Sequence, residues 1–233
     1  MENLTADSYL EGQVLFIDKP LTWTSFDVVN KIRMQLRKSL GIKKIKVGHA
    51  GTLDPLATGL VIICTGRATK QIMQYQDLEK AYTANVTLGT TTPSYDLETE
   101  FDGEYPWQHI DRKLLNQALD QFRGEQDQVP PIFSAKSVDG KRAYNMARKG
   151  QTIELKSNRV TISELDVLRF EAPEVDLHVA CSKGTYIRSL AHDLGKALES
   201  GAHLSGLRRT RIGPYQVDDA FPLEDFLKKL KLS

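Results

Sequence analysis

Asp54 is the side chain of this sequence best placed to do chemistry, because it lies in a glycine-rich segment, residues 48–59. Pro55 biases Asp54 away from helical backbone, and the glycines permit turns that larger residues resist. Residues 60–64 are all apolar, as expected for a strand covered on both faces. Loops anchored to such a core commonly carry reactive groups, so we predict that Asp54 is an active-site carboxylate. The simpler alternative is a turn in which the aspartate bonds its own backbone.

Arg188 is a second residue whose position indicates chemistry. If Thr185 caps the following helix, Arg188 lies in the first turn, where the helix dipole makes a cation unfavourable. It therefore needs a nearby anion. A surface carboxylate, Asp193 or Glu199, would give a structural ion pair, whereas Asp54 would give a catalytic pair in which the arginine keeps the aspartate ionised.

Both segments resemble the TruB-type pseudouridine synthases. The runs at residues 48–59 and 181–188 match motifs of that family over their whole length, which is far more specific than a short glycine motif. The resemblance extends from about residue 14 to residue 219. The other matching segments are residues 17–20, 24–26, 80–82, 129–131, 134–135, 140–144 and 207–209.

The resemblance implies a role for each matching site residue. Asp54 would be the catalytic nucleophile or base, and Arg188 would pair with it. His49 would extrude or hold the target nucleotide, and Tyr82 would stack on the flipped uracil. Two further residues would line the uracil pocket, Tyr186 and Leu207. From the residues alone, His49 could equally be a structural histidine, and Tyr82 and Leu207 ordinary core residues.

The implied reaction converts uridine 55 in the T-arm of tRNA to pseudouridine. The N1–C1′ bond breaks, the base rotates and a C5–C1′ bond forms, so we expect no cofactor and no metal. The base must leave its stack before a side chain can reach it, which predicts base flipping. We expect tRNA as the partner of a monomer without an obligatory protein partner, and the enzyme could also aid tRNA folding.

Three alternatives remain at this point. A non-catalytic RNA-folding module would keep the basic segments but would not need Asp54 and Arg188 together. A guide-RNA-dependent pseudouridine synthase would share the chemistry and differ in its RNA partner. A zinc nucleobase deaminase also flips bases, but its H-x-E and P-C-x-x-C signature does not occur in this sequence.

Length and composition place the chain among globular proteins. Its 233 residues suffice for one large domain or two small ones. The two cysteines, Cys64 and Cys181, fall in apparent core strands, so neither a disulfide framework nor a cysteine-based zinc site is indicated. No apolar stretch approaches the ~20 residues that span a membrane, and the N-terminus resembles no signal peptide, so we expect a cytoplasmic protein.

The net charge is only +1, but positive charge is unevenly distributed. No acidic residue occurs from position 28 to 53, whereas an acidic alternation from Asp96 to Glu104 would mark a face that avoids phosphate. Such runs are often only solvated helix faces, yet three cationic segments around one carboxylate suit a polyanionic substrate. The segments comprise Lys31, Arg33, Arg37, Lys38, Lys43, Lys44 and Lys46; Lys136, Lys141, Arg142, Arg148 and Lys149; and Arg208, Arg209 and Arg211.

Hydrophobic periodicity predicts the elements that position these residues. Strands are expected at residues 14–17, 60–64, 82–88 and 175–181. Helices are expected from a cap at Thr24 or Ser25 to Gly41, and at residues 114–122, 187–198 and 223–230. Adjacent prolines make residues 129–136 an exposed loop, which leads into a short helix at 142–149.

These elements alternate without regular βαβ repetition, which favours an α+β (mixed α/β) fold with a central mixed, largely antiparallel sheet flanked by helices. The resemblance implies a pseudouridine synthase fold with a thumb loop at about residues 129–150. We expect one catalytic domain at residues 1–233, without a separate C-terminal RNA-binding domain of the PUA type.

Overall fold

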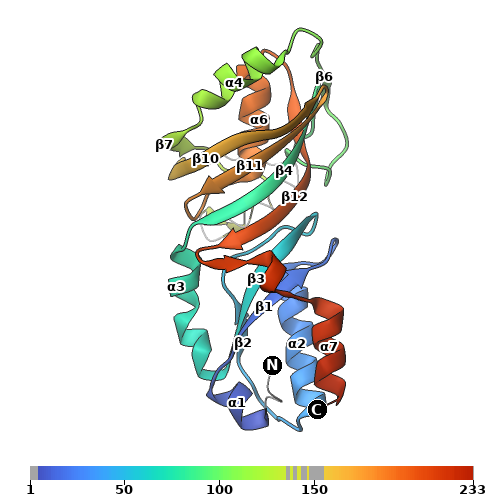
Figure 1. Cartoon of the computed structure of the whole chain (residues 1–233), viewed down its shortest axis with the longest axis vertical. Helices are drawn as coiled ribbons and strands as arrows, with labels where there is room; N and C mark the ends of the chain where they lie inside the picture. Colours follow the sequence, from blue (N-terminus) through green and yellow to red (C-terminus); the bar gives the residue numbers. More distant parts are fainter. Residues whose placement is uncertain (1–4, 135–136, 139–140, 143–145, 147–154, 233) are drawn as a thin grey trace. The chain divides into compact units, whose positions relative to one another are not determined.

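The computed structural model describes residues 5–232, except for residues 135–136, 139–140, 143–145 and 147–154 (Figure 1). The chain forms two compact units. Unit 1 comprises Met1–Ala81 and Arg208–Ser233, and unit 2 comprises Tyr82–Leu207. The boundaries fall within two strands, β4 (Lys80–Leu88) and β12 (Ala202–Ile212), so each of these strands contributes residues to both units.

Unit 1 is built on strands in the hydrogen-bonded order β14-β1-β3-β12. Strand β1 pairs with β14 in parallel and with β3 in antiparallel register, and β2 pairs with β3. The elements of this unit are α1 (Ala6–Glu11), β1 (Val14–Lys19), α2 (Ser25–Ser39), β2 (Val47–His49), β3 (Ala57–Thr65), a 3-10 helix (Gly66–Gln71), α3 (Ile72–Asp77), β13 (Tyr215–Gln216), a second 3-10 helix (Val217–Asp219), β14 (Phe221–Pro222) and α7 (Leu223–Leu232).

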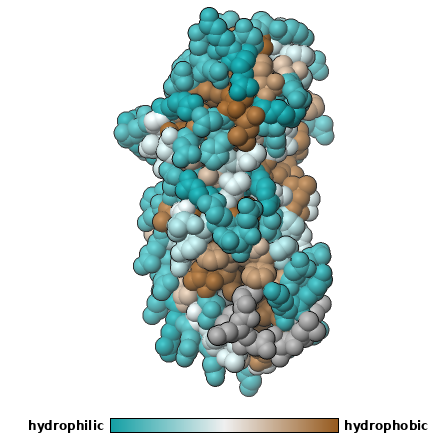
Figure 2. Space-filling model, in the orientation of Figure 1, coloured by the Kyte–Doolittle hydropathy of each residue, from teal (hydrophilic) through white to brown (hydrophobic). Residues whose placement is uncertain are grey.

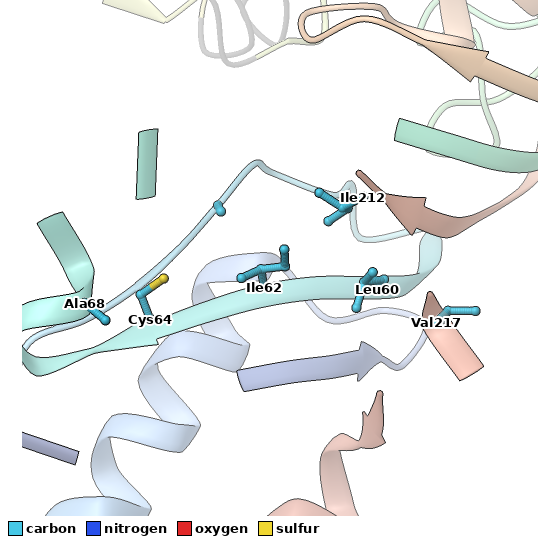
Figure 3. Packing of buried hydrophobic residues seen from close by; sticks show 7 residues of the cluster. Leu60, Ile62, Cys64, Ala68, Ile212 and Val217 are labelled. Carbon is cyan, nitrogen blue, oxygen red and sulfur yellow. The ribbon is translucent and has the colours of Figure 1, made fainter. Parts of the chain in front are cut away.

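The core of unit 1 lies around β3, every residue of which from position 59 to 65 is buried. Leu60, Ile62 and Cys64 point into one apolar cluster with Ile212 and Val217 (Figure 3). The residues between them in β3 are also fully buried. The prediction of a strand covered on both faces is therefore confirmed.

Helix α2 begins where the sequence predicts. Thr24 caps it, because the Thr24 side chain accepts the backbone N–H of Asp27 while the Asp27 carboxylate accepts that of Thr24. Gly41, with a φ of 64°, follows the helix in the left-handed conformation that favours glycine. Helix α7 lies beside α2 (Figure 1). This packing buries one face of each helix.

Unit 2 is built on strands in the order β12-β4-β11-β10-β7. The pairs β10–β11 and β10–β7 are antiparallel, and helices α4 and α6 pack together. Its further elements are β5 (Thr90–Thr91), β6 (Gly103–Glu104), α4 (Arg112–Asp120), β7 (Gly124–Gln128), β8 (Ser137–Val138), β9 (Lys141–Arg142), β10 (Asn158–Glu171), β11 (Glu174–Cys181) and α6 (Ile187–Ala197).

Outside residues 129–150 the predicted strands and helices are confirmed, and so is a mixed, largely antiparallel sheet with flanking helices. Two predictions about the start of the thumb are wrong. Pro130 and Pro131 are buried and not exposed. Proline has an apolar ring and no backbone N–H, so it can be packed in the interior without leaving a donor unpaired. Arg142 lies in the short strand β9 and not at the start of a helix. Most of the remaining thumb lies outside the described residues, and the single catalytic domain stays a prediction.

The face of the molecule seen in Figure 2 is largely polar. Figure 2 shows hydrophilic residues over most of the visible face, with hydrophobic residues exposed in smaller groups. Among the residues that the structure describes, no helix is both long and apolar enough to cross a membrane.

Candidate active site

The backbone of the loop that carries Asp54 is held on both sides of the aspartate. The buried hydroxyl of Ser25, the first residue of α2, accepts the N–H of Leu53 at 2.8 Å and donates to the Leu53 carbonyl at 3.2 Å. The N–H of Ala57 donates to the Asp54 carbonyl at 3.1 Å, which closes a turn with Pro55 in its second position. The loop therefore contains a turn closed by a backbone hydrogen bond and presents a half-buried side chain at Asp54.

Arg209 fixes the part of the loop before Asp54. Its guanidinium is 1% exposed and donates to the carbonyl of Leu60 at 2.7 Å, of Gly51 at 3.3 Å and of Thr52 at 3.4 Å. Gly51 has a φ of 96°, a backbone conformation that larger residues resist. A buried guanidinium suits this position because it offers several donors in a fixed plane. The prediction that Arg209 contributes to RNA binding is therefore wrong.

Lys19 fixes the part of the loop after Asp54. Its ammonium group is buried and donates to the carbonyls of Trp23 at 2.6 Å, Pro20 at 3.0 Å and Pro55 at 3.5 Å. Burial lowers the pKa of Lys19 to about 8, and the Asp54 carboxylate acts in the opposite direction. A cation thus lies near Asp54 within unit 1 and supports its negative charge.

Thr22 is a further residue that bonds the backbone after Asp54, and its own backbone is strained. Its N–H donates to the Pro55 carbonyl at 2.8 Å, and its φ is 69°. A β-branched residue in the left-handed region is an outlier that persists only where its surroundings impose it. The strained Thr22 backbone thus supports the Asp54 loop through its bond to Pro55.

His49 ends β2 in unit 1 and pairs in register with Ile63 of β3. Burial lowers the pKa of His49; a backbone hydrogen bond to Gly51 raises it, and the nearby charge of Arg209 lowers it. The imidazole is therefore mainly neutral at pH 7. A neutral ring suits contact with an uncharged base better than contact with a phosphate.

Arg188 is the second residue of α6 in unit 2, and its guanidinium is buried. Its Nε lies 3.6 Å from an Asp96 carboxylate oxygen, and its Nη1 donates to the carbonyls of Phe133 at 3.0 Å and Ser94 at 3.3 Å. The N-cap of α6 is Tyr186, so the predicted cap at Thr185 is wrong; the Thr185 hydroxyl donates to the Ser182 carbonyl instead.

Asp96 is the acidic partner of Arg188 that the sequence analysis missed. It is 5% exposed, so it does not belong to an exposed acidic face as predicted. Its carboxylate also accepts the N–H of Glu98 at 3.0 Å. Arg188 thus forms an ion pair with Asp96, which the sequence analysis did not name beside Asp193 and Glu199. The predicted pairing of Arg188 with Asp54, which lie in different units, stays a prediction.

The three residues expected around the uracil all belong to unit 2. Tyr82 is a buried residue of β4, and Leu207 is half-buried in β12. Tyr186 is half-buried at the N-terminus of α6, where its backbone N–H donates to the side chain of Gln128 at 2.8 Å. Gln128 was not found from the sequence.

The basic segments differ in what they offer a polyanion. In the first segment all lysines and Arg37 are exposed, and Lys31, Arg37, Lys38 and Lys43 line a groove of about 530 Å³. In the third segment Arg208 forms an ion pair with Asp18, and Arg211 with Glu79. The side chains of the second segment lie outside the described residues. Of the two basic segments whose side chains the structure describes, the one before Asp54 therefore holds more of the exposed cations.

Comparisons with protein families cover most of the chain. Residues 37–187 match the TruB family pseudouridylate synthase (N terminal domain), and residues 188–232 match the tRNA pseudouridylate synthase B C-terminal domain. The tRNA pseudouridine synthase B of Phocaeicola vulgatus is 57% identical over 219 residues, which are 94% of this chain and 93% of that protein. The protein of the same name from Flavobacterium johnsoniae is 54% identical over 98% of this chain and 100% of its own length.

Solved structures share the fold. A chain of the crystal structure of a Cbf5-Nop10-Gar1 complex superposes with a TM-score of 0.73 and 28% identity, over 97% of this chain and 57% of that chain. A chain of an H/ACA RNP bound to a substrate RNA containing 2′-deoxyuridine has a TM-score of 0.69 and 27% identity, over 97% and 56%. This chain thus spans a little more than half the length of both.

Proposed function

Because the chain belongs to the TruB family of pseudouridylate synthases, we propose that it converts uridine to pseudouridine in tRNA, at position 55 of the T-arm. The observation that carries the proposal is the Asp54 loop. Hydrogen bonds from Ser25, Arg209 and Lys19 fix the backbone around a half-buried carboxylate. A carboxylate held in this way is ready before substrate binds, as general acid–base or nucleophilic catalysis requires.

The reaction is an isomerisation, so its atoms balance within the substrate. The N1–C1′ bond breaks and a C5–C1′ bond forms, while C5 loses a proton and N1 gains one. We propose that Asp54 acts directly on the flipped nucleotide, as nucleophile or as base. Fixing the loop limits the carboxylate to few positions, which avoids the loss of rate that even ~1 Å of misplacement causes.

The other proposed site residues hold the extruded uridine. Tyr82 would stack on the uracil, since an aromatic face offsets part of the cost of unstacking the base. Tyr186 and Leu207 would line the uracil pocket, and a neutral His49 would contact the nucleotide. Arg188 would pair with Asp54 and keep it ionised. Support for these roles comes from the matching motifs and from the half-buried or buried position of each side chain.

The decisive experiment incubates the purified protein with an unmodified tRNA transcript, without any other RNA, and maps pseudouridine. We expect modification at position 55 and none in a transcript with cytidine there. Asp54→Asn should abolish the reaction while leaving tRNA affinity within about tenfold, because phosphate contacts dominate binding. Asp27→Asn is the matched control, since this exposed carboxylate caps α2 and is assigned no role in the reaction.

Each alternative predicts a different result. Turnover by Asp54→Asn would contradict the catalytic assignment. Modification that needs an added guide RNA would favour a guide-dependent synthase, which the similarity to chains of H/ACA complexes keeps as the second candidate. A protein that accelerates tRNA folding equally well with and without Asp54, and never forms pseudouridine, would be an RNA-folding module.

A further inference from the structure

Gln128 makes a reciprocal pair of hydrogen bonds with the backbone of a single residue, Tyr186. Its side-chain oxygen accepts the Tyr186 N–H at 2.8 Å, and its side-chain nitrogen donates to the Tyr186 carbonyl at 3.1 Å. Gln128 is 4% exposed and is the last residue of β7, whereas Tyr186 lies 58 residues further along the chain. This amide therefore bonds both the N–H and the carbonyl of Tyr186, as the backbone of a neighbouring strand would.

Two further contacts tie the segment after Gln128 to the same end of α6. The Ser189 hydroxyl donates to the Val129 carbonyl at 2.7 Å, and Arg188 donates to the Phe133 carbonyl at 3.0 Å. Tyr186 is the N-cap residue of α6, and its side chain makes no capping hydrogen bond. Residues 128–133 therefore supply contacts that fix the start of this helix.

We propose that Gln128 is a positioning residue for pseudouridine formation, which sets Tyr186 at the correct place to receive the flipped uracil. This inference rests on the proposed function and on the proposed role of Tyr186. Gln128 would not touch the substrate. It would act through the Tyr186 backbone, whose placement determines where the tyrosine ring lies.

The chemistry of the pair explains why this position requires an amide. Only glutamine offers both an acceptor for the Tyr186 N–H and a donor for the Tyr186 carbonyl at this side-chain length. An ionised glutamate would place a second acceptor against that carbonyl, whereas a protonated glutamate would donate again. Methionine keeps the approximate size and removes both bonds.

The test compares Gln128→Met with Gln126→Met. Gln126 lies two residues earlier in β7 and is half-buried, and its side chain donates to the Phe122 carbonyl, so it controls for loss of a hydrogen-bonded amide on the same strand. With T-arm RNA as substrate, we expect Gln128→Met to lower kcat by roughly 10- to 100-fold and to leave KM within about threefold. Gln126→Met should change neither constant.

Gln128→Glu adds a second measurement, the pH dependence of kcat, which a purely structural role of Gln128 would leave unchanged. Burial raises the pKa of a carboxyl group, so lowering the pH from 8 to 6 should protonate this glutamate and restore the donor. The kcat of Gln128→Glu relative to wild type should therefore rise as the pH falls. The ratio for Gln128→Met should stay constant.

Two results would overturn the inference while the wild type forms pseudouridine. One is a wild-type kcat in Gln128→Met. The other is equal losses of kcat and of unfolding midpoint in Gln128→Met and Gln126→Met, which would indicate a structural role alone. Failure of the proposed function would look different, as a wild-type protein that forms no pseudouridine, and it would overturn both proposals.

Discussion

Two adjacent arginines of β12 allow a direct test of how the Asp54 loop is held. Arg209 is buried and bonds three carbonyls, whereas the Arg208 side chain is 41% exposed and forms an ion pair with Asp18 at 2.7 Å. We change each to methionine, which keeps most of the apolar stem and removes the charge. The two variants then differ in which contacts are lost, at neighbouring positions of one strand.

The structure sets the expected magnitudes. A hydrogen bond from a charged donor contributes about 1.5–3 kcal/mol, and the two longer bonds of Arg209 are worth about 0.5–1 kcal/mol each. Arg209→Met should therefore lower the free energy of unfolding by about 2.5–5 kcal/mol. Arg208→Met should cost only about 0–1 kcal/mol, because solvent screens an exposed ion pair. In a chain of this length the loss is roughly 5–20 °C in Tm for the first variant and less than about 4 °C for the second.

Urea and thermal unfolding measure the stability of both variants, and NMR titration measures the pKa of His49. The positive charge of Arg209 lowers the pKa of His49, so Arg209→Met should raise it. The variant should also lower kcat, because Gly51 and Thr52 are then free to move. Equal unfolding midpoints for the two methionine variants, or an unchanged His49 pKa, would refute the role that we assign to Arg209.

Three further predictions concern charge. Lys19 has a folded pKa of about 8, below its unfolded value of ~10.4, so the unfolded chain binds more protons between these pH values. The free energy of unfolding of wild type relative to Lys19→Met should therefore rise by up to about 3 kcal/mol from pH 8 to 10.5. A difference that does not change with pH would contradict this. Arg188→Met leaves the buried Asp96 without its cation and should cost about 3–5 kcal/mol in urea unfolding, most of which Asp96→Asn should restore in the double variant. The third change replaces three exposed lysines before the Asp54 loop with alanine, namely Lys43, Lys44 and Lys46. The slope of log tRNA affinity against log salt concentration should become shallower by about 0.7–0.9 per lost phosphate contact. An unchanged slope would exclude this face from the RNA path.

The sequence predicts those parts of the fold that depend on local pattern. The consecutive apolar residues of β3 and the Thr24 cap of α2 identify their elements, because burial and capping follow from neighbouring residues. The site is harder to predict because its contacts are distant in sequence. Arg209 bonds Leu60 across 149 positions, and within a cationic run it is indistinguishable from a residue that binds phosphate.

The same limit explains the acidic partner of Arg188 and the role of Gln128. A cation in the first turn of a helix requires an anion, and the sequence predicts that need correctly. It does not select Asp96, which lies 92 positions earlier and looks like part of an acidic surface. Gln128 carries no charge and belongs to no local motif of capping or turn formation, so no signal in the sequence marks its bond to Tyr186.

The division of cations between the interior and the surface has a consequence for catalysis. Lys19 and Arg209 are buried on backbone carbonyls around Asp54, so neither can bind phosphate. Their bonds order the loop in the free protein, which means that RNA binding need not provide the free energy to order it. On the proposed function, phosphate contacts from the exposed lysines would serve to capture the RNA. Substitutions at the buried cations should therefore lower kcat more than they weaken RNA binding, and substitutions at the exposed lysines should do the reverse.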